Sequence, residues 1–302
     1  VENFRPDVKT RLGIDYEALK ALNPRVILAS ISGFGQDGPY AKRPGFDQIA
    51  QGMGGLMSIT GDPDGGPMRV GIPIADLTAG LFAAMGILTA LIEREKSGEG
   101  QWLHTSLLQS QAFMLDFQAA RWVMQGEVAG QAGNEHPTSI PTNRYLTSDG
   151  AVNIAVAGNE TWQRLCKAFG RSDWAEDEAL STNAGRREHR VKLNADIEAI
   201  TRTKTTAEWV EALTAAGVPC GPIYKIDEMF ADPQVQHLGI AQPLTTEPFG
   251  ETLAMAQPVA LTRTPSSMAA SPPTRGQHNE ELLAELGIDA PAYAALQEKS
   301  VV

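Results

Sequence analysis

The stretch 76–98, DLTAGLFAAMGILTALIEREKSG, constrains the fold most, because it predicts one long helix with an apolar face. Its apolar residues recur at spacings of four and three, which is the period of an α-helix. Basic residues would lie in the last turn, and Gly98 would end the helix. The residues that define this apolar face are Leu77, Leu81, Ala84, Leu88 and Leu91.

Strand-like and helical segments alternate around this helix. Apolar runs of strand length occur at 25–32 (RVILASIS), 101–108 (QWLHTSLL) and 151–157 (AVNIAVA). This alternation predicts an α/β protein with a smaller second domain. Residues 126–150 are rich in Gly, Asn, Pro, Thr and Ser, and we interpret them as a segment between domains. Further helices are expected at 15–22, 109–125, 161–170, 186–201 and 278–286, and after a capping box at Thr205 and Glu208.

Composition excludes several classes of protein. The net charge of −11 over 302 residues argues against nucleic acid as a partner, because phosphate binding needs an excess of Lys and Arg. The two cysteines, Cys166 and Cys220, stand apart from each other and from the histidines, so a zinc site or a disulfide framework is not expected. Uninterrupted apolar runs stay short of 18 residues, and no signal-peptide pattern opens the chain. We therefore expect a cytoplasmic protein without a membrane partner.

One glycine motif is misleading. GFGQDG (33–38) matches G-x-G-x-x-G directly after a predicted strand, as a dinucleotide-binding turn would. Pro39 and Pro44 follow, however, and no helix pattern opens there. Without a helix N-terminus there is no row of free N–H groups for a pyrophosphate. We expect a tight loop here and no NAD site.

Asp76 has two interpretations. Aspartate is a favoured N-cap residue, and the helix that follows is convincing. The dipole at a helix N-terminus also keeps a carboxylate ionised, and an ionised carboxylate can attack an activated acyl group. The pattern by itself favours the cap over catalysis and leaves both open.

Several ordered motifs resemble the class III CoA-transferases, also called the CaiB/BaiF family. The resemblance runs through VENFRPDVKTRLGIDYEALKALNPRVILASISGFGQDGPY, RPGFDQIAQGMGGLMSITG and VGIPIADLTAGLFAAMGILTALIEREKSGEGQ. It resumes in GVPCGPIYKIDEMFADPQVQHLG and GQHNEELLAELGI. It implies a Rossmann-like large domain formed by 1–139 and 241–302, a smaller α+β domain formed by 140–240, and an interlocked homodimer.

The resemblance also implies the chemistry. The family nucleophile falls in PIADLTAG, so Asp76 is expected to attack an acyl-CoA and to carry aspartyl anhydride and aspartyl-CoA thioester intermediates. CoA would pass from an acyl-CoA, such as succinyl-CoA, to a carboxylic acid without a metal or NAD. The positions that line the CoA site in the family correspond here to Asn3, Phe4, Arg11, Leu12, Ser32, Gly33 and Phe34.

The segment 133–144, GNEHPTSIPTNR, resembles the branch of the family that acts on dicarboxylic acids. His136, Ser139 and Arg144 are therefore expected to meet a substrate carboxylate. The related α-methylacyl-CoA racemases carry a catalytic histidine where this chain has Phe46, and Phe cannot exchange a proton with an α-carbon. A racemase is thus the less favoured alternative.

The chain begins at VENF, where family members have a preceding N-terminal βα region. From this we expect a chain that folds poorly alone or depends on a partner, since a sheet without its first strands exposes edges. A non-catalytic, truncated relative is the second functional alternative.

Overall fold

The computed structural model describes residues 1–246, 249–268 and 271–302. The contacts divide the chain into two compact units, Val1–Pro222 and Ile223–Val302, which are described separately. The assignment of 1–139 with 241–302 to a large domain, and of 140–240 to a small one, stays a prediction.

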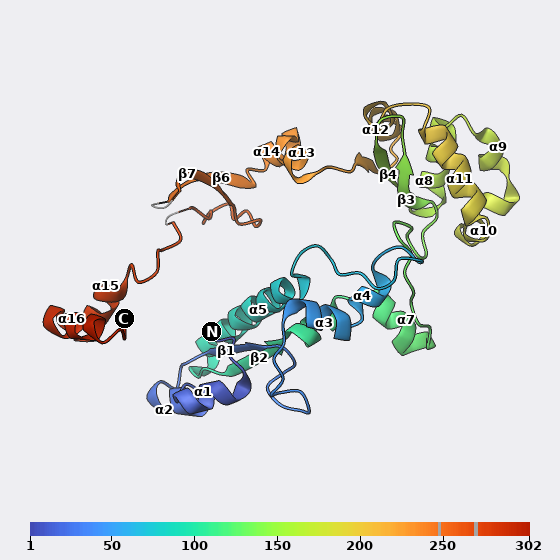
Figure 1. The fold of residues 1–302 in the computed structure, drawn as a ribbon. Helices are drawn as coiled ribbons and strands as arrows, with labels where there is room; N and C mark the ends of the chain where they lie inside the picture. Colours follow the sequence, from blue (N-terminus) through green and yellow to red (C-terminus); the bar gives the residue numbers. More distant parts are fainter. Residues whose placement is uncertain (247–248, 269–270) are drawn as a thin grey trace. The chain divides into compact units, whose positions relative to one another are not determined.

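The first part of unit one contains a parallel pair of strands, β1 (Leu28–Ser32) and β2 (Trp102–Ser106), in register from Leu28 opposite Trp102. Glu2 forms a parallel bridge with Ser30 on the other edge of β1. Between the strands in sequence, α5 (Ile74–Ser97) packs against both of them (Figure 1). The predicted strand–helix–strand order is therefore confirmed, and it gives a parallel pair.

The α5 helix packs on the strands through small residues. Its buried residues are Ala75, Thr78, Ala79, Ala83 and Ala90. A Cβ added at Gly86 would lie 3.1 Å from Leu103 Cδ1, which shows how closely the helix approaches β2. The predicted apolar face of this helix, here called the leucine face, is exposed to solvent: Leu81 and Leu88 are 66% and 60% exposed. Gly98 ends the helix as expected, with a φ of 80°.

The α5 helix also contains an 18-residue window of mean hydropathy 1.8, with 28% of that window buried. Among the described residues it is the one helix long and apolar enough to cross a membrane by length and composition, although core helices of soluble proteins pass the same test. The expectation from sequence considered only uninterrupted apolar runs, and it therefore missed this window.

Shorter helices surround this core. The expected helix at 109–125 is broken at Asp116, whose φ is 48°, into α6 (Leu107–Phe113) and α7 (Phe117–Gln125). Between β1 and α3 the structure has turns and bends and no helix, as the failed G-x-G-x-x-G context predicts. The helices of this part are α1 (Pro6–Leu12), α2 (Tyr16–Leu22), α3 (Asp47–Met53), α4 (Leu56–Ile59), α6 (Leu107–Phe113) and α7 (Phe117–Gln125).

The rest of unit one is an antiparallel sheet in the order β3-β4-β5, covered by helices (Figure 1). Its core includes Trp162, Leu165, Ile197, Leu213 and Val152. The capping box at Thr205 is present and opens α12 (Thr206–Ala215). The elements are β3 (Thr142–Leu146), β4 (Ala151–Ala155), α8 (Gly158–Ala168), α9 (Ser172–Glu176), the 3₁₀-helix η1 (Glu178–Leu180), α10 (Asn183–Glu188), α11 (Arg190–Thr201), α12 (Thr206–Ala215) and β5 (Cys220–Pro222).

The described residues of unit two form an antiparallel hairpin and four helices. Leu253 and Met255 of its second strand are 65% and 61% exposed, so the described hairpin leaves apolar side chains in solvent. The elements are α13 (Ile226–Ala231), α14 (Pro233–His237), β6 (Ala241–Thr246), β7 (Gly250–Met255), α15 (Asn279–Glu285) and α16 (Ala290–Glu298).

Candidate active site

Asp76 is the third residue of α5, and the N-cap position is occupied by Pro73. The cap is supplied from another helix: Asp47 Oδ1 accepts a hydrogen bond of 2.8 Å from the backbone N–H of Ala75. Asp76 itself is exposed, and among the described residues no group donates a hydrogen bond to its carboxylate. The cap interpretation of Asp76 is therefore wrong, and its carboxylate is available for another role.

The surroundings of Asp76 favour its protonated form. Desolvation by the adjacent protein, and then the negative charge of Asp47, raise the pKa of Asp76 above its usual value. The position of Asp76 in the first turn of α5 opposes this trend, since the helix dipole favours an anion there. A carboxylate with a raised pKa is a stronger base and nucleophile in its ionised form than an ordinary aspartate.

The parallel strands place Asp76 at one edge of their sheet. The α5 helix connects β1 to β2 in sequence and runs in the opposite direction to these parallel strands. Its first turn therefore lies near the carboxyl ends of both strands. Ala75 and Ala79 accordingly share a buried cluster with Leu107, the residue directly after β2. In open α/β sheets, ligands bind outside the carboxyl ends of the strands.

The residues expected to bind CoA come together at the same end of β1. Ser32 is its last residue and is buried, and Gly33 and Phe34 follow directly. A Cβ at Gly33 would lie 2.7 Å from the Gly45 Cα, so the turn after β1 touches the backbone that leads into α3. This close approach explains the glycines better than a dinucleotide motif does.

The other CoA candidates lie on the outer side of β1. Because Glu2 pairs with Ser30 in parallel, Asn3 and Phe4 run toward the carboxyl end of the strand. Arg11 and Leu12 end α1, and all four of these candidates are exposed. The buried Lys9 of α1 contacts Glu2 (3.4 Å) and donates to Gln36 Oε1, which fixes α1 beside the turn after β1.

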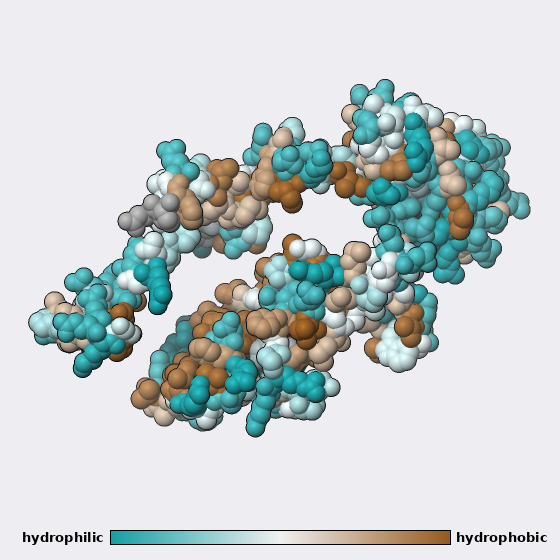
Figure 2. Space-filling model, viewed as in Figure 1, coloured by the Kyte–Doolittle hydropathy of each residue, from teal (hydrophilic) through white to brown (hydrophobic). Residues whose placement is uncertain are grey.

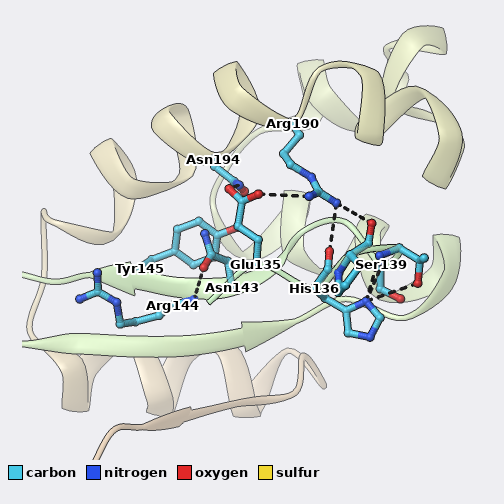
Figure 3. A network of polar contacts seen from close by, with 10 residues as sticks. Glu135, His136, Ser139, Asn143, Arg144, Tyr145, Arg190 and Asn194 are labelled. Carbon is cyan, nitrogen blue, oxygen red and sulfur yellow. Dashed lines mark hydrogen bonds and ion pairs between the residues drawn. The ribbon is translucent and has the colours of Figure 1, made fainter. Parts of the chain in front are cut away.

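His136 and Ser139 lie together in a loop before β3 (Figure 3). His136 Nδ1 accepts hydrogen bonds from the backbone N–H of Thr138 (3.2 Å) and of Ser139 (3.0 Å). Its ring also stacks on Phe117 at a centroid distance of 5.8 Å. Nδ1 is thus used by the loop, and Nε2 is the nitrogen left to meet a ligand.

A partly buried network holds this loop in place. Arg190 donates to Glu135 Oε2 (3.1 Å) and to the carbonyls of His136 and Pro137 (both 3.0 Å). Asn194 bridges Glu135 Oε1 (2.7 Å) and the Tyr145 hydroxyl (2.7 Å). These contacts connect the loop to α11 and β3 (Figure 3).

Arg144 is not brought together with His136 and Ser139. It lies on β3 between Asn143 and Tyr145, and Tyr145 faces α11, so Arg144 projects from the other face of the sheet. Figure 3 shows its guanidinium pointing away from the His136 ring. The contacts of the described residues also do not join Asp76 to this loop.

Sequence reasoning missed Asp47 and Gln51. Gln51 Nε2 donates to Asp47 Oδ2 (2.6 Å), and Gln51 Oε1 accepts from the Val70 N–H (2.9 Å). Both side chains are buried. The available signal was their i, i+4 spacing in GFDQIAQ, which places them on one helix face. Among the described residues, no group of three or more His, Cys, Asp or Glu could hold a metal ion.

Comparison with known proteins agrees with this arrangement. The family model for CoA-transferase family III matches residues 1–279. The succinate–glutarate CoA-transferase of Agrobacterium fabrum is 39% identical over 286 residues, which cover 95% of this chain and 72% of that protein. The succinyl-CoA–D-citramalate CoA-transferase of Chloroflexus aurantiacus is 35% identical over 308 residues, covering 100% of this chain and 76% of that protein.

Among solved structures, a CaiB/BaiF family protein from Brucella suis matches with a TM-score of 0.80 and 34% identity, covering 94% of this chain and 74% of that one. The chain therefore belongs to CoA-transferase family III and is an enzyme that transfers CoA. The predicted class III identity and α/β fold are confirmed.

Proposed function

We propose that this enzyme moves CoA from succinyl-CoA to a second dicarboxylic acid through covalent intermediates on Asp76. The observation that carries this proposal is the first turn of α5, where Asp47 caps the helix and Asp76 stays exposed without a partner among the described residues. A helix whose cap comes from elsewhere has no structural need for the Asp76 carboxylate.

The reaction proceeds in four acyl transfers. Asp76 attacks the thioester carbonyl of succinyl-CoA, the C–S bond breaks, and CoA thiolate leaves a mixed anhydride. The thiolate then attacks the aspartyl carbonyl, which forms an aspartyl-CoA thioester and releases succinate. The acceptor carboxylate displaces the thiolate in the same way, and the thiolate attacks the acceptor carbonyl to give the new acyl-CoA. One thioester replaces another, so no ATP, metal or NAD enters the balance.

The names of the relatives support the substrate class. Those proteins are CoA-transferases of succinate or succinyl-CoA with glutarate and D-citramalate, and both acceptors are dicarboxylic acids. We assign one acceptor carboxylate to the loop with His136 Nε2 and the Ser139 hydroxyl, both hydrogen-bonding groups. Arg144 projects from the opposite face of β3, so its proposed role in substrate binding requires that the substrate reach that face.

CoA itself is proposed to lie along the carboxyl end of β1. Phe4 and Leu12 are 42% and 54% exposed and offer apolar surface for the adenine. Arg11 is exposed and suits a phosphate. Ser32, Gly33 and Phe34 would then follow the pantetheine arm, and Asn3 would lie beside them.

We further propose a cytoplasmic homodimer. The leucine face of α5 is apolar and exposed in the single chain, and apolar surface gathers over this helix in Figure 2. Monomeric soluble proteins rarely leave a continuous apolar stripe of this kind in water. A second copy of the chain is the occupant that the interlocked assembly of the family suggests.

Trapping the intermediate tests the function. The protein is incubated with succinyl-CoA and hydroxylamine, and the peptide that contains GIPIADLTAG is analysed by mass spectrometry. We expect a hydroxamate on Asp76 in the wild type and none in Asp76→Ala. Asp64→Ala is the matched control, because Asp64 is an exposed turn residue and its loss should leave labelling unchanged. Labelling elsewhere, or turnover by Asp76→Ala, would exclude Asp76 as the nucleophile.

A further inference from the structure

We propose that Asp47 is a positioning residue for Asp76, holding the first turn of α5 in place and setting the charge around the nucleophile. This inference rests on the proposed function of Asp76. It assigns a role in the reaction to two buried polar residues of α3, Asp47 and Gln51.

One hydrogen bond connects Asp47 to the backbone next to Asp76. Asp47 Oδ1 accepts from the Ala75 N–H at 2.8 Å, and Ala75 directly precedes Asp76. A carboxylate that bonds this amide fixes the backbone one residue from the nucleophile. The Asp76 carboxylate has no hydrogen bond among the described residues, so its placement depends on this backbone.

Asp47 is itself held by the buried amide of Gln51. Gln51, one turn later on α3, donates to Asp47 Oδ2 at 2.6 Å and accepts from the Val70 N–H at 2.9 Å. Gln51 Nε2 also donates to the Ile72 carbonyl at 3.3 Å. One buried amide therefore ties α3 to the segment that leads into α5. Gln111 of α6 donates to the Gly54 carbonyl at 3.0 Å and secures the other end of α3.

Burial of the Asp47 carboxylate has a free-energy cost. Asp47 is 8% exposed, and a buried carboxylate is expensive unless it is paired or hydrogen-bonded. A neutral Ser or Asn would cap the helix with less desolvation. The N-terminus of a 24-residue helix compensates part of this cost. The negative charge of Asp47 also raises the pKa of Asp76, as described above.

The charged surroundings of Asp76 are simple. Of the elements packed on α5, β1 and α6 contain no ionisable residue. The α3 helix contributes only Asp47, β2 contributes only His104, and the segment 60–73 before α5 contains Asp62, Asp64 and Arg69. Of these groups, Asp47 is the charge that raises the pKa of Asp76, so its removal is the direct way to change the ionisation of Asp76.

The test compares three variants of the full chain in steady-state CoA transfer. Asp47→Asn keeps an oxygen for the Ala75 N–H but removes the charge, and Asp47→Ala removes both. Asp15→Asn is the matched control, because Asp15 caps α2 through the Ala18 N–H (3.1 Å) and lies on another helix. For Asp47→Ala we expect kcat to fall about 100-fold with little change in KM for succinyl-CoA, because misplacement of a reacting group costs rates of that order.

For Asp47→Asn we expect a smaller fall in kcat, and the acid limb of its pH profile should move to lower pH. The direction follows because loss of a neighbouring negative charge lowers the pKa of Asp76. A merely structural role would reduce folded protein without moving this limb. If Asp47→Ala does not fold, Asp47→Asn decides the question.

Hydroxylamine labelling of the wild type separates the two proposals. A labelled wild type together with unchanged kcat and pH profile in Asp47→Asn would overturn the role of Asp47 alone. An unlabelled wild type would overturn the function of Asp76 and this inference with it. A rise in KM with unchanged kcat would also contradict a positioning role, since it indicates lost ground-state binding.

Discussion

Arg190 and Glu135 form a partly buried ion pair of 3.1 Å that joins α11 to the loop in front of β3. Arg190 also donates to the carbonyls of His136 and Pro137, so one guanidinium satisfies three acceptors of the loop. The two residues are 55 positions apart in sequence. The ion pair therefore fixes the conformation of the loop, which the local sequence of the loop does not determine.

Replacement of Arg190 should disturb that loop before it disturbs the domain core. Arg190→Met removes the three hydrogen bonds and keeps an apolar stem, and we expect a loss of about 1–3 kcal/mol in the free energy of unfolding. Urea denaturation measures this loss. Arg202→Met is the matched control, since Arg202 pairs with Glu198 at the surface and should cost less than about 1 kcal/mol.

The same variant should weaken acceptor binding. If His136 and Ser139 meet the acceptor carboxylate, a loosened loop raises KM for the acid more than KM for succinyl-CoA. Initial rates with the two substrates varied in turn separate these constants. Equal KM values in Arg190→Met and the wild type would remove the loop from acceptor recognition.

The raised pKa of Asp76 gives a prediction about stability. A carboxyl group whose pKa is higher in the folded state binds protons more tightly there, so ionisation of Asp76 opposes folding as the pH rises. Asp76→Asn removes this ionisation. We expect its melting temperature at neutral pH to equal or exceed that of the wild type, although transfer is lost.

Calorimetry at neutral and acidic pH tests this sign. The advantage of Asp76→Asn should shrink toward acidic pH, where the wild-type carboxyl is also neutral. A variant that is clearly less stable than the wild type at neutral pH would show that the charged carboxylate supports the fold.

The elements predicted best from sequence are those whose signals are local. The helix that ends at Gly98, and the capping box at Thr205, depend on residues within one turn of each other. Strand β1 was also predicted, because the run 25–32 is apolar and short. The break at Asp116 was missed, since the apolar pattern continues across it and a single residue with a φ of 48° leaves no periodic signal.

The candidate site also combines features with a local sequence signal and features that depend on contacts distant in sequence. The position of Asp76 was available from a motif, but the capping role given to it by pattern belongs to Asp47, a residue 28 positions from Ala75. The periodicity of a single segment cannot predict a hydrogen bond between two helices. The segment 126–150, interpreted as a connection between domains, contains β3, whose partner strand is recognised only once both are folded.

Core and surface leucines should respond differently to truncation. Leu213 is fully buried in the core of the β3–β5 part, so Leu213→Ala should lower the free energy of unfolding by about 2–5 kcal/mol. Leu22 is 85% exposed, and Leu22→Ala should stay within about 0.5 kcal/mol of the wild type. Chemical denaturation of both variants provides the scale against which the α5 leucines are judged.

Leu81 on the α5 apolar face tests the proposed homodimer. A second copy that covers this face would bury Leu81, and an aspartate there would leave an unpaired charge in the interface, so Leu81→Asp should sediment as a monomer. Val191→Asp is the control, because Val191 is 86% exposed on α11 and its replacement should leave the assembly unchanged. Sedimentation velocity of the wild type and both variants gives the masses directly. A wild-type monomer would contradict the homodimer, and a Leu81→Asp dimer would place the interface on another face, because a charge buried at an apolar contact cannot be tolerated without a partner.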